Sequence, residues 1–344
     1  MKKKIDRNTS RSRRLLILLA AVPLLATLLQ GCGGSNAAPA GDIGVSQKGE
    51  RTAGGVLNYG FVGTNKPGGV EGWGFHTGII QEALEPLGIT EIKLVPFQTG
   101  PDLNESIIGG RVHLGNSGDT PAILARSTGA STKILNFSNT EINTIFIGLK
   151  EIQAPEDLAG QKVAVVKGSL MHRFLVGFLN EKGLSDVVEI ININSIPDTE
   201  AALLRGEIAA YAITSSYYSA YKLRQQGYPL VAEAREYPAL YSTSVVYAAE
   251  DYLEQYPGFR EAWLAARQQA YEDLIAKPDD YYAWLSEQTG TPVEDIKELQ
   301  PIEALPDEAL AAEGIERVEA AKDFLIEEKL ARRDFDVDEW ILQP

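Results

Sequence analysis

The sequence predicts an α/β protein with two doubly wound α/β domains, joined by two crossing segments and followed by a helical C-terminal tail. Three observations lead to this fold class. Strand and helix patterns alternate three times over residues 56–130, and the same alternation returns over residues 162–227. Extended segments near 141–150 and 243–249 separate these units and are the predicted crossings. From Asp251 onward the chain is rich in Ala, Glu and Tyr and is predicted to be almost entirely helical.

The N-terminus has the pattern of an export signal. Basic residues precede an uninterrupted apolar run from Leu15 to Leu29, which is shorter than the roughly 20 residues of a membrane-spanning helix. The segment ending in Cys32 resembles a bacterial lipoprotein box, which implies a signal peptide over 1–31 and a lipid on Cys32. Ordinary cleavage with an unmodified thiol is the alternative. Residues 32–54 are rich in Gly, Ser, Ala and Pro and are predicted to form a flexible tether.

Charge and length narrow the class of protein. Residues 1–31 hold seven basic residues and one acidic residue, so their removal changes the net charge from −15 to −21. Such an acidic body repels nucleic acid. The remaining roughly 290 residues are too many for one ordinary core. We therefore expect domain I over 55–145 plus 246–344, with the tail packed back on it, and domain II over 146–245.

Within each unit the elements follow from hydrophobic runs bounded by turn residues. In the first unit the predicted strands are 56–63, 91–97 and 112–116, and the predicted helices are 76–88, 100–110 and a segment beginning near Thr120. In the second unit the predicted strands are 162–168, 188–193 and 209–214, and the predicted helices are 170–183, 198–207 and 216–227. In such folds ligands bind outside the carboxyl ends of the strands, in the cleft between domains.

The predicted helix starts beside this cleft carry turn and capping residues. Pro121 suits a first helical position, which makes Thr120 the expected N-cap. The amides that follow lack intrahelical partners and favour an anion. A structural cap without a ligand is the alternative. Similar starts follow Pro101, Ser169 and the cluster from Thr214 to Ser216.

The stretches "FQTGPDLNESIIGGRVHLGNSGDTPAILARSTGA", "APEDLAGQKVAVVKGSLMHRFL" and "DTEAALLRGEIAAYAI" resemble the substrate-binding proteins of bacterial ABC importers for nitrate, sulfonates and taurine. The order and spacing of these stretches carry the resemblance over about residues 56–249. It implies a hinged, two-domain periplasmic-binding-protein type II fold that closes on an anionic solute. The Gly-rich segment around Trp73 is similar to the sulfonate and sulfate-ester branch. The ligand-binding positions it implies are Trp73, Gly74, Gly100, Pro101, Asp119, Thr120, Gly168, Ser169, Thr214, Ser215, Tyr217, Tyr241, Ser242 and Thr243. His172 is a further candidate, because it lies one turn into the predicted helix that follows Ser169.

Two of these positions bear on the ligand. An apolar ligand tail would pack on Trp73, although a core or surface tryptophan is the alternative. After Ile213, relatives often carry a carboxylate, whereas this chain has Thr214, Ser215, Ser216 and Tyr217. The missing carboxylate disfavours taurine-like zwitterions and favours a sulfonate or sulfate ester, with the hydroxyls of Thr214 and Ser215 as donors.

Catalysis is disfavoured. Enzymes that resemble this fold, a desulfinase and a thiamine-pyrimidine synthase, depend on a cleft cysteine, and Cys32 is the only cysteine here. The three histidines form no metal-ligand pattern and no GxSxG turn occurs, so no catalytic residue, metal or cofactor is expected. The resemblance implies a lipid-anchored monomer in the periplasm or at the cell surface, serving a separate permease and ATPase. A nitrate, taurine or thiamine-pyrimidine binder and a non-transport sensor remain alternatives.

Overall fold

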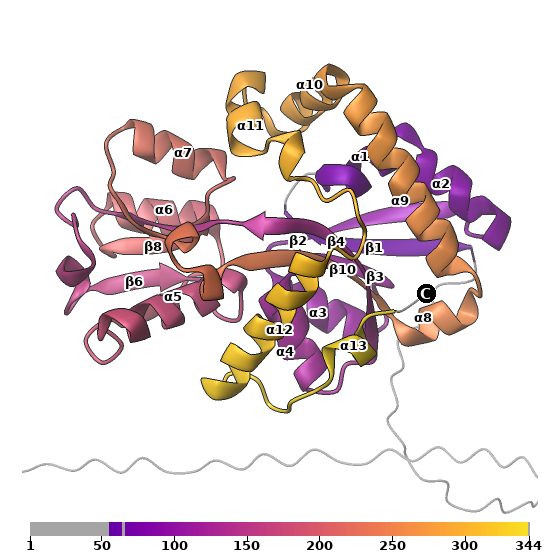
Figure 1. Ribbon diagram of the computed structural model, residues 1–344. Coiled ribbons are helices and arrows are strands. Elements are labelled where there is room, and N and C mark those ends of the chain that lie inside the picture. Colours follow the sequence, from indigo (N-terminus) through magenta and orange to yellow (C-terminus); the bar gives the residue numbers. More distant parts are fainter. Residues whose placement is uncertain (1–54, 64–65, 343–344) are drawn as a thin grey trace, which may run out of the picture. The chain divides into compact units, whose positions relative to one another are not determined.

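The computed structural model describes residues 55–63 and 66–342 (Figure 1). The predictions of a signal peptide over 1–31, a lipid on Cys32 and a tether over 32–54 concern positions outside these residues. The described residues carry two five-stranded sheets with helices on both faces, so the predicted α/β fold class is confirmed.

The first sheet has the strand order β2-β1-β3-β10-β4. Its strands are β1 (Val56–Val62), β2 (Glu91–Phe97), β3 (Leu114–Gly118), β4 (Thr132–Ile142) and β10 (Ser242–Ala249). Strand β1 pairs parallel with β2 and β3, whereas β10 runs antiparallel between β3 and β4. The chain places β2 on one side of β1 and β3 on the other, so the strand order reverses at β1. Doubly wound sheets leave a ligand crevice at such a reversal point.

Helices from both ends of the chain cover the first sheet. They are α1 (Gly69–Thr77), α2 (Ile79–Leu84), α3 (Gly100–Ile108), α4 (Asp119–Ser127), α8 (Glu250–Gln255), α9 (Phe259–Ala276), α10 (Pro278–Thr289), α11 (Val293–Leu299), α12 (Ala312–Glu327) and α13 (Val337–Trp340). Figure 1 shows α9 with α1 and α2 on one side of the strands, and α3, α4, α12 and α13 on the other. Apolar residues of the tail, such as Trp263, Val318 and Trp340, join the core of this sheet, so the tail packs back on it.

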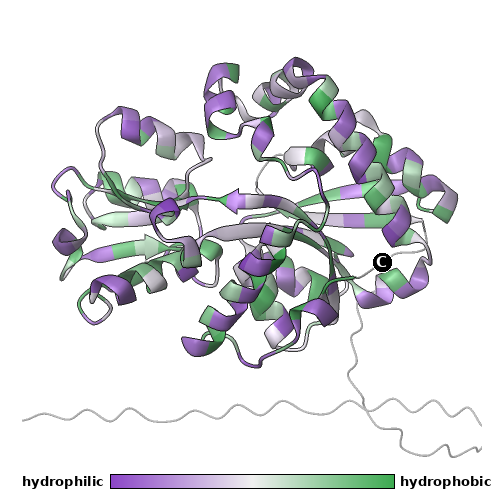
Figure 2. Ribbon diagram, viewed as in Figure 1, coloured by the Kyte–Doolittle hydropathy of each residue, from purple (hydrophilic) through white to green (hydrophobic). Residues whose placement is uncertain are grey.

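The second sheet has the same kind of strand order, β7-β6-β8-β5-β9. Its strands are β5 (Thr144–Gly148), β6 (Lys162–Val165), β7 (Glu189–Asn192), β8 (Ala210–Thr214) and β9 (Leu230–Glu233), and its helices are α5 (Leu170–Lys182), α6 (Ile196–Leu204) and α7 (Tyr218–Gln225). Helix α5 packs its phenylalanines on one face, and α6 and α7 cover the other. Each helix carries hydrophobic and hydrophilic residues, which suits a helix with one face in the core (Figure 2).

We call the part built on the first sheet (residues 55–142 and 242–342) lobe A and the part built on the second sheet (residues 144–233) lobe B. Asn143 joins β4 to β5, and residues 234–241, which contain two short 3₁₀ turns (Ala234–Glu236 and Pro238–Leu240), join β9 to β10. The second crossing therefore precedes the predicted segment 243–249, which pairs with β3 and β4 along its length. A buried extended strand and a crossing segment look alike in sequence because both are apolar and extended. The domain boundaries at 145 and 245 stay a prediction.

The Gly-rich segment around Trp73 forms helix α1, whereas the sequence predicted a helix here only from residue 76. Glycines in α1 allow close packing: a Cβ on Gly72 would lie 1.9 Å from the carbonyl oxygen of Pro67, and one on Gly74 would lie 2.8 Å from the Ile80 side chain. Glycine thus lets this helix pack closely against neighbouring residues. Intrinsic helix propensities do not include this packing effect.

Membrane-spanning elements were sought in the described part of the chain. No helix there combines the length and the apolar character that crossing a membrane requires.

We expect Gly72→Ala to lower the free energy of unfolding by about 2 kcal/mol, because the new methyl group meets rigid backbone. Gly68→Ala is the matched control, since the nearest atom to its Cβ lies 3.7 Å away, and it should change stability by less than about 0.5 kcal/mol. Urea unfolding midpoints measure both. Equal midpoints for the two variants would contradict the packing role of Gly72.

Candidate functional site

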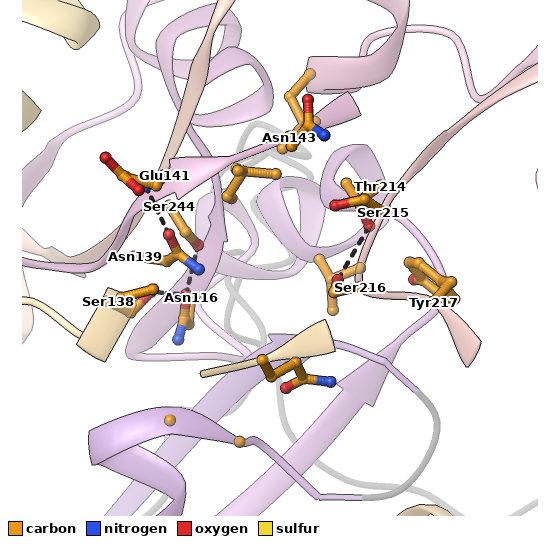
Figure 3. Close-up of a pocket in the computed structure, with 18 of the residues that line it drawn as sticks. Asn116, Ser138, Asn139, Glu141, Asn143, Thr214, Ser215, Ser216, Tyr217 and Ser244 are labelled. Atoms are coloured by element: carbon orange, nitrogen blue, oxygen red, sulfur yellow. Dashed lines mark hydrogen bonds between the residues drawn. The ribbon is translucent and has the colours of Figure 1, made fainter. Parts of the chain in front are cut away.

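A cavity of about 430 Å³ lies where strand ends of the two lobes meet. Residues at the carboxyl ends of β1, β3 and β8 line it, together with the first residues of α5 and the last residues of β4. Figure 3 shows two polar walls that face each other across this space. Lobe A supplies Asn116, Ser138, Asn139, Glu141 and Ser244, and lobe B supplies Thr214, Ser215, Ser216 and Tyr217.

Four of the ligand positions expected from the sequence line this cavity: Ser169, Thr214, Ser215 and Tyr217. The remaining eleven do not line it: Trp73, Gly74, Gly100, Pro101, Asp119, Thr120, Gly168, His172, Tyr241, Ser242 and Thr243. Their roles in the structure are given below, because most of them hold the two walls in place.

Asp119 and Thr120 are fully buried and bonded within the protein. The Asp119 carboxylate lies 3.1 Å from the guanidinium of Arg173, which is also fully buried and comes from α5 of lobe B. The backbone amide and the hydroxyl of Thr120 both donate to Asp119. The carboxylate therefore takes the place at the start of α4 that an anionic ligand was expected to fill. The helix begins at Asp119 with Gly118 as its N-cap, which corrects the expected cap at Thr120.

Arg173 joins three segments of the chain. Its Nε donates to the Thr120 hydroxyl at 3.1 Å, and its Nη2 donates to the Tyr241 carbonyl and the Ser242 hydroxyl, both at 2.9 Å. The backbone amide of Thr243 completes the group by donating to Asp119 at 3.0 Å. Tyr241, Ser242 and Thr243 thus fix the end of the second crossing, and their role as ligand contacts stays a prediction.

Three of the remaining expected positions serve close packing. A Cβ on Gly100 would lie 2.5 Å from the ring of Pro121, so the starts of α3 and α4 touch only because residue 100 is glycine. A Cβ on Gly168 would lie 3.3 Å from Pro101, which places lobe B against lobe A there. Gly100, Pro101 and Gly168 therefore position the helix starts beside the cavity.

Trp73 and Gly74 lie in the core of lobe A. The Trp73 ring is 4% exposed, packs edge-on against Tyr281 and Trp284, and donates its indole N–H to Asp273 at 2.9 Å. Trp73 thus packs as a core residue in this structure, which favours the core alternative, and its contact with a ligand tail stays a prediction.

Ser169 and His172 form the cap of α5. The Ser169 hydroxyl donates to the Val166 carbonyl at 2.6 Å and accepts from the His172 amide at 3.2 Å, which agrees with the predicted N-cap. His172 Nδ1 accepts from the Gly168 amide at 3.3 Å. Burial, and then the nearby Lys167, lowers the His172 pKa, which suits the neutral ring that this bond requires.

The wall of lobe B combines three hydroxyl side chains with a helix start that has no side-chain cap. The hydroxyls of Thr214 and Ser216 lie 3.4 Å apart, and Ser215 lies between them at the end of β8. Side chains cap α3, α5 and α6, whereas the N-cap of α7, Tyr217, makes no side-chain capping bond. The first amides of α7 therefore remain without the partner that a cap would give.

Arg235 lies on the second crossing and lines the same cavity. Among the described residues, no carboxylate forms a salt bridge with its guanidinium. Its backbone amide donates at 3.2 Å to Asn143, the residue of the first crossing, so both crossings meet beside the cavity. The sequence did not single out Arg235, because the crossing was expected further along the chain.

The wall of lobe A comes from an irregular pairing of β4 with β10. Ser244 pairs with Asn139 and Val245 pairs with Phe137, so Ser138 is the extra residue of a bulge. A regular strand would turn Ser138 and Asn139 to opposite faces, whereas both line the cavity here. Sequence periodicity gives no signal for a bulge, and this wall was missed for that reason.

Glu141 places a carboxylate on the cavity wall. The sequence argument against zwitterionic ligands rested on the lack of a carboxylate after Ile213. No carboxylate follows Ile213, as the sequence shows, but Glu141 on β4 of the other lobe brings one to the cavity, so the argument against zwitterions stays untested. The nearest cation to Glu141 is Arg317 of α12, with 3.9 Å between Nη2 and the carboxylate oxygen.

A metal would need several convergent ligands. Within residues 55–63 and 66–342, no group of three or more His, Cys, Asp or Glu side chains is placed to hold one.

Comparisons with known proteins agree with this geometry. The family model described as NMT1/THI5 like matches residues 90–281. A putative aliphatic sulfonates-binding protein from Escherichia coli K12 is 28% identical over 263 residues, covering 74% of this chain and 80% of that protein. The taurine-binding periplasmic protein of the same organism is 26% identical and covers 61% and 63%. The alkanesulfonate-binding protein SsuA from Xanthomonas axonopodis pv. citri, bound to MOPS, shares the fold with a TM-score of 0.70 at 22% identity, covering 84% and 99%.

Arg173→Met should lower the free energy of unfolding by about 3 to 5 kcal/mol, because it leaves the Asp119 carboxylate buried without its partner. Adding Asp119→Asn should restore part of that loss, since the two residues act as a unit. Arg205→Met is the control: its salt bridge with Glu207 is exposed, and stability should not change measurably. Calorimetric unfolding of the wild-type protein, the Arg173→Met and Asp119→Asn single variants, the double variant and the control tests this, and additive losses for Arg173 and Asp119 would argue against the pair.

Proposed function

The chain belongs to the NMT1/THI5-like family, and from this premise we propose that it is a lipid-anchored, extracytoplasmic solute-binding protein that delivers a small organic anion to an ABC importer. The ligand we propose is an aliphatic or aryl sulfonate or a sulfate ester. The sulfonate-binding and taurine-binding names of the relatives support this class. A separate permease and its ATPase would complete the importer.

The observation that carries the proposal is the wall of lobe B. Hydroxyls of Thr214, Ser215 and Ser216 stand beside the uncapped start of α7, and the Arg235 guanidinium lines the same cavity. Oxyanions bind at such helix starts because amides and hydroxyls donate to them and the helix dipole favours negative charge. The guanidinium adds a charged donor. We therefore place the anionic group of the ligand at this wall.

Binding without reaction is the simpler function for these residues. The sequence has a single cysteine, Cys32, and the described residues that line the cavity include no cysteine to act as a thiol nucleophile. Its two serine-rich walls contain no histidine that would take a proton from a hydroxyl.

The double variant Thr214→Val/Ser215→Ala should weaken sulfonate binding at least tenfold, because two donors to the anion are lost. Arg235→Gln should do the same, whereas Arg224→Gln, on the exposed side of α7, should leave affinity unchanged. Titration calorimetry of the purified protein with alkyl sulfonates, aryl sulfonates and sulfate esters gives the dissociation constants.

A thermal-shift panel that adds taurine, nitrate and thiamine pyrimidines sets the ligand class. A ligand at 100 times its dissociation constant stabilises the fold by about 2.7 kcal/mol, which is readily detected. Stabilisation by nitrate or a pyrimidine alone would replace the sulfonate with that ligand. Unchanged sulfonate affinity in the Thr214/Ser215 variant would contradict the proposal that the anionic group binds at the wall of lobe B.

Lipid attachment at Cys32 is tested in cells. The intact protein should incorporate a labelled fatty acid and partition into the membrane fraction, and Cys32→Ser should do neither. If the wild-type protein and the Cys32→Ser variant both appear in the soluble fraction to the same extent, lipid attachment is contradicted and ordinary signal cleavage is supported.

A further inference from the structure

Helix α7 of lobe B carries two tyrosines that reach helix α11 of lobe A. Tyr218 and Tyr221 are three positions apart, so they lie on one face of α7, and their stacked rings have centroids 6.2 Å apart. The Tyr221 hydroxyl donates to the Glu298 carboxylate at 3.1 Å. The Tyr218 hydroxyl donates to the Asp295 carboxylate, and desolvation, followed by this hydrogen bond, raises the pKa of Tyr218. Two tyrosines of one lobe thus meet two carboxylates of the other.

The two carboxylates of α11 are available to these tyrosines. Lys297, the lysine of the same helix, forms its salt bridges with Asp279 and Glu294, at 3.7 and 3.9 Å. Within the described part of the chain, no salt bridge involves Asp295 or Glu298. An ionised carboxylate can only accept hydrogen bonds, so a tyrosine hydroxyl, which donates, is a suitable partner.

The contact between α7 and α11 lies at the rim of the cavity. Residues 214–217, which line the cavity, directly precede Tyr218, and residues 299–301, which also line it, directly follow Glu298. Figure 1 shows α7 and α11 on the same side of the two sheets. The second crossing lines the cavity through Arg235. The cavity therefore extends from the crossings to the contact between α7 and α11.

Of these two boundaries, the contact between α7 and α11 is the one that can open. The crossings are continuous chain, and the buried pair of Arg173 and Asp119 joins the lobes beside them. The hydrogen bond between Tyr221 and Glu298 is exposed to solvent, so water can replace it with little change in free energy. Exposed hydrogen bonds between separate segments suit a contact that forms over a solute and breaks to release it.

Helix α11 presents its carboxylates from a well-packed base. Ile296 lies between Asp295 and Glu298 in the sequence and is 1% exposed. It belongs to an apolar cluster with Trp284 and Leu285 of α10, separate from the main core of lobe A. Removal of a tyrosine hydroxyl on α7 should therefore leave the fold of this part of lobe A intact.

We propose that Tyr218 and Tyr221, together with Asp295 and Glu298, form a clasp that holds the cavity closed over its solute and sets the rate at which the solute leaves. None of these four residues lines the cavity, so the clasp acts on residence time and not on the choice of solute. The inference rests on the proposed function for the identity of the solute, whereas the contact itself is a feature of the protein.

The rate of solute release tests the clasp. Tyr218→Phe/Tyr221→Phe removes both hydroxyls and keeps both rings. With 1-butanesulfonate as the probe, we expect release to be faster by about fivefold or more, and association to change by less than about twofold, because only the closed form loses hydrogen bonds. Stopped-flow fluorescence measures both rates. The control is Tyr228→Phe, a tyrosine of lobe B whose ring lies under Lys150, outside the cavity lining, and it should keep both wild-type rates.

A double-mutant cycle locates the effect at the contact. Tyr221→Phe and Glu298→Ala each break the same hydrogen bond, so the double variant should release 1-butanesulfonate no faster than the faster of the two single variants. Multiplied effects of the two substitutions on the release rate would show that these residues act separately.

Amide hydrogen exchange of the ligand-free protein gives a readout that needs no solute. Loss of the clasp should speed exchange in residues 218–221 and 299–301 by about threefold or more, because the rim opens more often. The interior of α5 should keep its wild-type exchange rates, which also establishes that the variant is folded.

The outcomes separate the two proposals. Unchanged release of a bound sulfonate, or unchanged exchange at both segments, would overturn the clasp and leave the sulfonate function intact. A fall in the association rate as large as the rise in the release rate would also overturn it, since the tyrosines would then act on the open form. Failure of every sulfonate and sulfate ester to bind would overturn the proposed function, and the exchange rates alone would then decide on the clasp.

Discussion

The ion pair between Arg173 and Asp119 is the contact on which the arrangement of the site depends. Both side chains are fully buried, they come from different lobes, and Arg173 also bonds the backbone of the second crossing. Burying two charges is expensive unless their geometry and remaining hydrogen bonds are good, so such a pair tolerates little displacement. It holds the starts of α4 and α5 together and fills the start of α4 with a protein carboxylate. The start of α7, by contrast, has no side-chain cap.

The cavity has two polar walls. Lobe B supplies the hydroxyls of Thr214, Ser215 and Ser216, the second crossing supplies the guanidinium of Arg235, and lobe A supplies serine hydroxyls, asparagine amides and the Glu141 carboxylate. Residues of both lobes and of both crossings line this one cavity, so its shape depends on how the two crossings hold the lobes.

The fold was predictable because its signals are local. Each of these signals spans only a few residues. Hydrophobic runs and the Ser169 cap indicate the order of strands and helices, and the hydroxyls after β8 indicate one wall of the cavity. Arg173 lies within a helix, 54 residues from Asp119, and no local pattern announces their pairing. The wall of lobe A depends on a bulge at Ser138, and α1 is rich in glycines that normally indicate a loop. These features follow from tertiary packing, which overrides local propensity.

The position of β10 has a consequence for how the chain folds. In the first sheet, β4 is joined to β3 only through β10, which the chain supplies after all of lobe B. Lobe B is one continuous segment, so its contacts can form early, whereas the sheet of lobe A must await a distant strand. Until then the edges of β3 and β4 are open to mispairing with other chains. The late return of β10 makes completion of lobe A the slow, aggregation-exposed step, and it couples that step to the prior folding of lobe B.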